Sequence, residues 1–92
     1  MLVSVELAKQ FLHLDQDDTD DDSIILIIIK AAEEYLFEAT KREFTSENSR
    51  AVLFLMVLIT HWYENREMIG KTNSTIDETI RSLKVQLIYG DV

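Results

Sequence analysis

The sequence predicts an all-α fold, namely a small four-helix bundle built around a long central helical hairpin. Three observations carry this prediction. The 92 residues contain no proline and only two glycines, Gly70 and Gly90, so little interrupts regular structure. Apolar residues recur three and four positions apart along most of the chain, which is the period of an amphipathic helix. The length fits one domain, which we predict to span residues 1–92.

The first helix is predicted over residues 5–12, with Ser4 as its N-cap. An acidic loop follows at residues 15–22, where DQDDTDDD places six aspartates in eight positions. Like charges repel and aspartate is a poor helix former, so this run is expected to stay non-helical. Its last acids precede the second helix, where the positive end of the helix macrodipole favours them.

The second helix is predicted over residues 21–40, because apolar residues gather on one face when the chain turns by about 100° per residue. The residues of that face are Ile24, Ile25, Ile28, Ile29, Ala32, Tyr35, Leu36 and Ala39. Leu26, Ile27 and Phe37 lie outside it, among the charged residues. These three exceed what the buried face requires.

The third helix is predicted over residues 49–67, with Ser46 or Asn48 as candidate caps. Its first half is apolar all round, and a helix that is hydrophobic on every side must be covered on every side. The residues opposite its main apolar face are Leu53, Phe54 and Val57. Gly70 is placed to end this helix or the turn after it.

The fourth helix is predicted over residues 75–88, because Thr75 and Glu78 form a T-x-x-E capping box. Its apolar stripe is narrow and consists of Ile76, Ile80, Leu83 and Leu87. The tail beyond this helix is expected to be loose in an isolated subunit.

The formal net charge of −8 disfavours binding to nucleic-acid phosphates or to an anionic membrane surface, since both require basic residues. The acidity is local, because residues outside the acidic loop carry a net charge of only −2. No targeting segment is visible, and the longest apolar run, 51–59, is shorter than the ~20 residues of a membrane span. We expect a protein that stays soluble where it is made.

No residues form a catalytic, cofactor-binding or metal-binding constellation, so we expect neither an enzyme nor a cofactor. The chain has no cysteine, and its two histidines, His13 and His61, have no second ligand at metal spacing. The acidic loop fails the calcium-loop pattern: starting at Asp18, Ser23 stands at the glycine position and Ile29 at the glutamate position. A solvated, helix-capping loop is the favoured interpretation.

One alternative stays open at the start of the second helix. The tripeptide Asp22-Ser23-Ile24 resembles the Asp-Ser-Leu site at which acyl carrier proteins receive phosphopantetheine on serine. A serine in the first turn of a helix is the simpler interpretation.

Residues 61–67, HWYENRE, contain the residue types that most often anchor protein interfaces. We predict that Trp62 and Tyr63 complete the apolar face of the third helix. Arg66 and Glu67 are expected to be exposed, or paired between helices or subunits.

The order of these segments resembles the head–tail connector family of tailed bacteriophages and prophages, also described as head-completion adaptors or DNA-packaging proteins. The resemblance rests on the short first helix, the acidic loop, Ala31-Ala32-Glu33-Glu34-Tyr35 (residues 31–35), and the string at 61–67, in that order. The sequence departs from the family where His13 replaces a basic residue, where Lys41 replaces a glycine, and in lacking proline after the second helix.

The resemblance implies a structural virion protein, made in the host cytoplasm, that forms an oligomeric ring between portal and tail and completes the head after DNA packaging. Its partners would be copies of itself, the portal protein, and a tail or head-completion protein, while DNA passes without sequence-specific binding. A different small helical interaction module, or a carrier protein modified at Ser23, are the alternatives. The excess of apolar residues supports multimerisation independently.

Two sets of residues are predicted to form contacts in such an assembly. The subunit or partner interface is expected to include Leu26, Phe37, Phe54, Arg66, Glu67 and Tyr89. The acidic loop is expected to face the channel lumen or a basic partner through Asp17, Asp18, Asp20 and Asp21. A negative lining would repel DNA phosphates and let the genome slide.

Overall fold

The computed structural model describes residues 2–72 and 74–89, and this part of the chain is all-helical, as predicted. Its elements are α1 (Val5–Phe11), α2 (Asp22–Thr40), α3 (Ser49–Glu64), the 3-10 turn η1 (Arg66–Met68) and α4 (Ser74–Tyr89). The third helix ends three residues before the predicted position and continues as η1, because Asn65 leaves the helical conformation.

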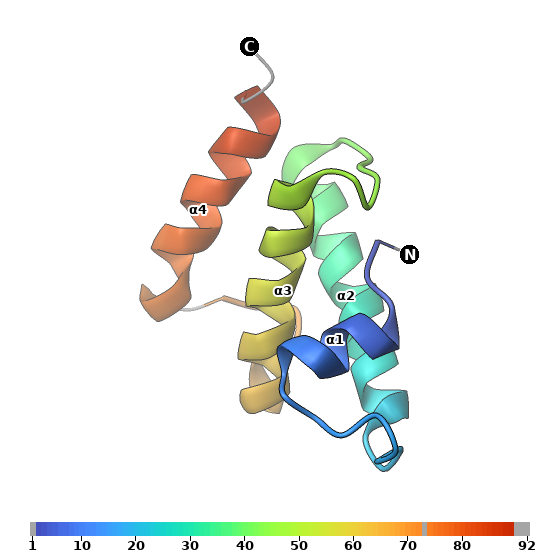
Figure 1. Ribbon diagram of the computed structural model, residues 1–92. Coiled ribbons are helices and arrows are strands. Elements are labelled where there is room, and N and C mark those ends of the chain that lie inside the picture. The colour runs from blue at the N-terminus through green and yellow to red at the C-terminus, as the bar shows by residue number, and fades with distance from the viewer. Residues whose placement is uncertain (1, 73, 90–92) are drawn as a thin grey trace.

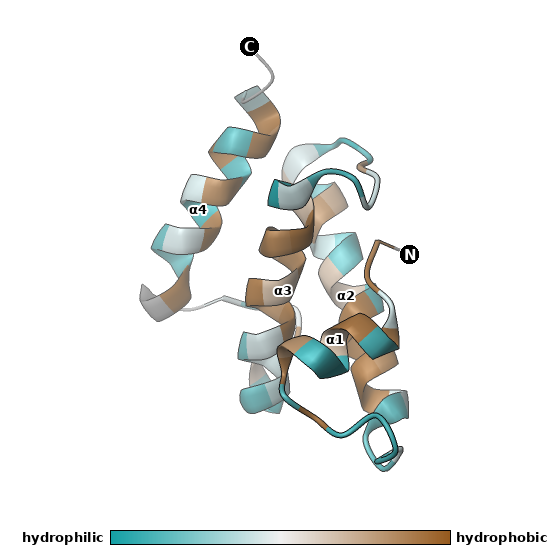
Figure 2. Ribbon diagram, in the orientation of Figure 1, coloured by the Kyte–Doolittle hydropathy of each residue, from teal (hydrophilic) through white to brown (hydrophobic). Residues whose placement is uncertain are grey.

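The antiparallel hairpin of α2 and α3 forms the centre of the molecule (Figure 1). α1 lies across this hairpin, and α4 packs along the other side of α3. Apolar residues dominate the first turns of α3, whereas polar and apolar residues alternate along α4 (Figure 2). The three other helices therefore cover most of α3, although Leu53 remains exposed, so coverage on every side is not reached within the subunit.

The helix ends follow local chemistry. Ser4 Oγ accepts a hydrogen bond from the backbone N–H of Leu7 at 3.1 Å, and Asn48 Oδ1 accepts one from Ala51 at 3.0 Å. These contacts confirm Ser4 as the N-cap of α1 and select Asn48 as the cap of α3.

Residues in the left-handed backbone conformation follow the first two helices. The φ angle is 61° at His13, after α1, and 56° at Lys41, after α2. Glycine adopts this conformation without a Cβ penalty, so the glycine expected from the family at Lys41 would fit this backbone. Gly70 has a φ of 85° in the turn after η1, where the sequence predicts the end of the third helix or of the turn that follows it.

The capping box predicted for α4 lies outside the described residues, because the side chain of Thr75 is not described. The helix itself begins at Ser74, one residue earlier than predicted.

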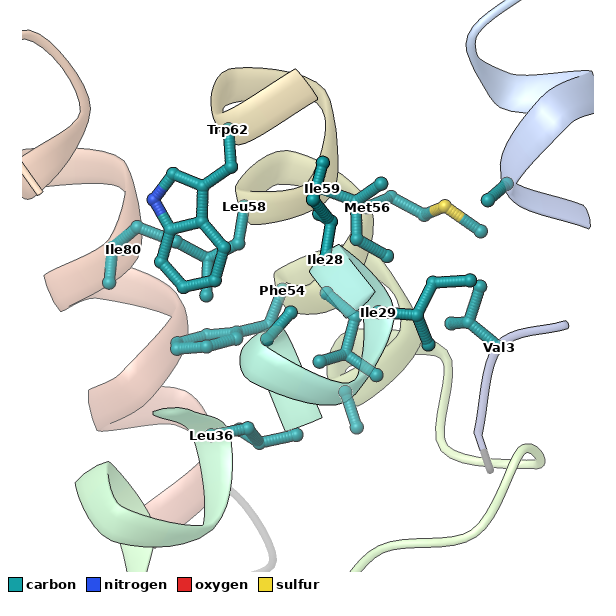
Figure 3. Close-up of a cluster of buried hydrophobic side chains, with 14 of the residues drawn as sticks. Val3, Ile28, Ile29, Leu36, Phe54, Met56, Leu58, Ile59, Trp62 and Ile80 are labelled. Carbon is teal, nitrogen blue, oxygen red and sulfur yellow. The ribbon is translucent and has the colours of Figure 1, made fainter. Parts of the chain in front are cut away.

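The core joins all four helices and the N-terminal segment. Trp62 is fully buried, its ring meets Tyr35 edge-on at 5.8 Å, and its Nε1 donates to the backbone oxygen of Lys71 at 2.7 Å. Val3 extends the core beneath α1 (Figure 3). The prediction that Trp62 belongs to the core is confirmed, and its indole also fixes the connection to α4.

Phe54 corrects one expectation from the sequence. We expected it outside the buried face and at an interface, but it is fully buried, with its ring between Leu36 and Trp62 (Figure 3). The expectation is wrong because α3 buries two faces, one against α2 and one against α4. Phe54 therefore belongs to the core of the subunit and leaves the candidate interface.

Candidate functional site

The buried side chain of Lys9, on α1, holds the acidic loop in place through hydrogen bonds. Its side chain is only 3% exposed, although lysine is rarely buried. Its Nζ donates to the backbone oxygens of Gln16 and Asp18, at 3.1 and 2.6 Å, and to Asp22 Oδ1 at 2.9 Å. The ammonium thus replaces its lost hydration with three oxygens and draws both ends of the loop onto α1.

Two aspartates of the loop stabilise turns within it. Asp15 Oδ1 accepts the backbone N–H of Asp17 at 2.9 Å, and Asp18 Oδ1 accepts that of Asp20 at 3.0 Å. Side chains of this type commonly close such Asx turns. The described contacts leave the exposed carboxylates of Asp17 and Asp20 to solvent, so these two are the loop charges available to a partner.

Asp21 ties the end of the loop to the end of α3. Its Oδ2 accepts a hydrogen bond from the Tyr63 hydroxyl at 2.6 Å and one from Arg66 at 3.3 Å. The Arg66 guanidinium also lies 5.5 Å from the centre of the Tyr63 ring. We call this triad of Asp21, Tyr63 and Arg66 the loop latch.

The latch shifts the titration of Tyr63. The hydrogen bond to the Asp21 carboxylate, then burial, raise the pKa of the Tyr63 hydroxyl above its ordinary value, although Arg66 opposes this. Arg66 and Asp21 are about half and two-fifths exposed, so their ion pair alone contributes little. The short, partly buried hydrogen bond of Tyr63 is the stronger part of the latch.

Large apolar side chains remain exposed on the outer faces of the helices. Ile27, Phe37 and Leu53 are 56%, 43% and 46% exposed. Leu26 and Val57 are half-buried, so these two contribute less free surface than the sequence predicts. An apolar surplus therefore exists without Phe54, on α2 and α3.

A groove of about 880 Å³ runs along the outer face of α2. We call it the α2 groove. Its apolar lining comes chiefly from Leu2, Phe37 and Phe44, and its acidic lining from Glu33, Glu34, Glu38 and Glu43. Lys30 and Arg42 are the basic lining residues. Acids thus outnumber basic residues four to two around an apolar surface.

The remaining predicted interface residues lie at two distant places. Arg66 belongs to the loop latch, and the neighbouring Glu67 is exposed. Tyr89 is 65% exposed at the end of α4. The structure does not bring these residues into one patch, since the C-terminal ends of α3 and α4 lie at opposite ends of the molecule (Figure 1).

Within the described residues, no group of three or more histidine, aspartate or glutamate side chains is arranged to hold a metal ion. In the same part of the chain, no helix is both long enough and apolar enough to cross a membrane. Ser23 is exposed in the first turn of α2.

The fold and its surface define a small helical structural protein with exposed apolar side chains of the kind used in assembly. The chain belongs to the phage gp6-like head–tail connector family, whose model matches residues 3–89. It is accordingly a structural phage protein of the head–tail junction. No match was found among curated proteins or among solved structures.

Proposed function

We propose that copies of this chain form a ring between the portal and the tail, and that the ring completes the head after DNA packaging. The observation that carries the proposal is the family match over residues 3–89. The exposed Ile27, Phe37 and Leu53 support it, because unpaired apolar side chains on the outside of a small bundle gain stability when a neighbour covers them. The portal protein and a tail or completion protein are the proposed partners.

Deleting the gene from its phage tests this function. We expect heads that package DNA but fail to retain it or to acquire tails, because the junction is incomplete. Electron microscopy of the particles and infectivity measure both effects, and wild-type protein supplied in trans should restore them. Tailed, infectious particles formed in the absence of the protein would contradict the proposal.

The acidic loop is proposed to face the channel or a basic partner through Asp17 and Asp20. Its other acids already act within the subunit, where Asp18 closes a turn and Asp21 holds the loop latch. A negative channel lining repels DNA phosphates, so packaged DNA passes without binding.

The double substitution Asp17→Asn and Asp20→Asn tests this role without removing a described contact of the fold. We expect the free energy of unfolding to change little and DNA retention, ejection or partner docking to be impaired. Glu6→Gln with Glu47→Gln is the matched control, because both acids are exposed outside the loop. Normal infectivity of the loop variant would remove the loop from this role.

A further inference from the structure

The outer side of α4 carries a stripe that the fold of the subunit does not use. Its residues are Arg81, Lys84, Val85, Ile88 and Tyr89, whose spacing places them on one face of the helix. Val85 and Tyr89 are 47% and 65% exposed, while Ile80, Leu83 and Leu87 face the core. We call this face the α4 stripe.

The charge of the α4 stripe is positive. Arg81 and Lys84 stand beside its apolar residues, and no acid occurs from Thr79 to Tyr89 (residues 79–89). The two acids of the helix, Asp77 and Glu78, lie in its first turns. From residue 79 onward the stripe is thus apolar and basic, while Asp77 and Glu78 lie on the same face one turn earlier, four and three residues before Arg81.

The α2 groove has the complementary character. Phe37 and Phe44 supply aromatic surface, and the acids along it outnumber the basic residues. Specific interfaces commonly combine aromatic residues with charged residues whose sign is opposite to that of the partner surface.

Within one subunit the stripe does not cover the groove, because Phe37, Val85 and Tyr89 all remain exposed. α4 packs chiefly on α3 and less on α2, and Arg42, at the edge of the groove, reaches the backbone of the last turn of α4 (Figure 1). A contact between different patches on identical subunits is heterologous, and its repetition builds a ring when the rotation closes.

We infer that the α4 stripe of one subunit packs into the α2 groove of the next. This inference rests on the proposed ring and names the surfaces that join its subunits. A second copy is the occupant favoured over another virion protein, because this chain itself carries both complementary surfaces. The basic residues of the stripe meet the acids of the groove, and Val85 and Tyr89 cover Phe37.

Charge reversal gives the first test. One variant carries Arg81→Glu and Lys84→Glu, and another carries Glu34→Lys and Glu38→Lys. Each alone should lose the multimers that the wild-type chain forms, because stripe and groove then repel each other. An equimolar mixture should recover them, since each stripe then meets a groove of opposite charge. Circular dichroism verifies that both variants fold, and native mass spectrometry counts the subunits.

Disulfide trapping gives the second test, and the absence of cysteine from the chain makes it clean. Phe37→Cys combined with Val85→Cys should give a ladder of linked multimers when the concentrated protein is oxidised. Leu53→Cys with Val85→Cys is the matched control, because Leu53 is as exposed as Phe37 but lies on α3. The ladder should form several-fold faster with the first pair than with the control.

The outcomes separate this interface from the ring itself. Wild-type multimers that show no preferential 37–85 link, or charge-reversal variants that fail to recover on mixing, overturn the interface and leave the proposed ring standing. Preferential linking with recovery on mixing supports the interface. If the groove binds only a basic segment of another virion protein, the 37–85 ladder is no faster than the control, which likewise overturns the inference.

Discussion

A buried ammonium group is stable only when oxygens replace its water, and Lys9 takes those oxygens from the loop that follows its helix. The six aspartates of that loop would otherwise repel one another. Lys9 neutralises one of them, Asp22, and holds the loop backbone through the carbonyl groups of Gln16 and Asp18. Sequence patterns did not reveal this role, because the contacts depend on how the loop folds back over α1.

We predict that Lys9→Met lowers the free energy of unfolding by about 2 kcal/mol, because two carbonyl groups and Asp22 lose a charged donor. Urea denaturation followed by circular dichroism measures the change, and proteolysis within the loop should accelerate. Lys41→Met is the control, since its ion pair with Glu38 is about 70% exposed and contributes little. Equal effects of the two substitutions would contradict the role of Lys9.

Among the elements, the end of α3 depends most on contacts distant in the sequence. Periodicity predicts the four helices, since each buries a stripe, but it extends the third helix to residue 67. In the structure Asn65 leaves the helix, and its side chain donates to the backbone oxygen of His61 at 3.0 Å. The loop latch then takes Tyr63 and Arg66 to Asp21, a partner more than 40 residues away that no local pattern identifies.

The raised pKa of Tyr63 makes the latch sensitive to alkaline pH. A group whose pKa is raised on folding stabilises the protein fully below its unfolded pKa, about 10 for tyrosine, and loses this effect as the pH rises through the folded value. Tyr63→Phe should therefore cost about 1 kcal/mol at pH 7 and progressively less above pH ~10.

Urea unfolding of wild type and Tyr63→Phe between pH ~8 and ~11 measures this difference. Titration of the other groups is common to both proteins and cancels in the comparison. Tyr89→Phe is the control, because this ring is largely exposed and lies outside the latch, and it should cost little at pH 7. A difference for Tyr63→Phe that stays constant across the range would show that the latch does not respond to tyrosine ionisation.

For the whole molecule, the sequence predicts the fold class correctly, but it predicts less well which side of each helix is buried. The apolar character of α3 predicted that it is covered on every side, and most of its apolar residues are buried, but Leu53 is not. It did not show whether neighbours within the chain or other subunits cover it. α4 closes over Phe54, while Leu53 stays exposed one residue earlier, so adjacent apolar residues had different outcomes. Which of the two residues is buried depends on where α4 packs against α3, and no local sequence pattern in α3 predicts that position.

Arg42 connects the α2 groove to α4, the two parts of the subunit that carry the proposed assembly surfaces. It borders the α2 groove, and its guanidinium donates to the backbone oxygens of Leu87 and Ile88, at 2.7 and 3.5 Å, in the last turn of α4. The last carbonyl groups of any helix lack an N–H donor from a following turn. The negative end of the helix macrodipole also favours a cation at this position.

We therefore predict that Arg42→Ala destabilises the last turn of α4 by about 1 kcal/mol and accelerates amide exchange there roughly fivefold. Hydrogen exchange with mass spectrometry on dilute protein measures this, with the amides of α2 as an internal reference. Lys71→Ala is the control, because this exposed cation lies just before the start of α4, at the opposite end of the helix from its last turn. Unchanged exchange in α4 of the Arg42 variant would mean that packing of the apolar stripe alone holds the helix. In that case α4 would be positioned independently of the α2 groove.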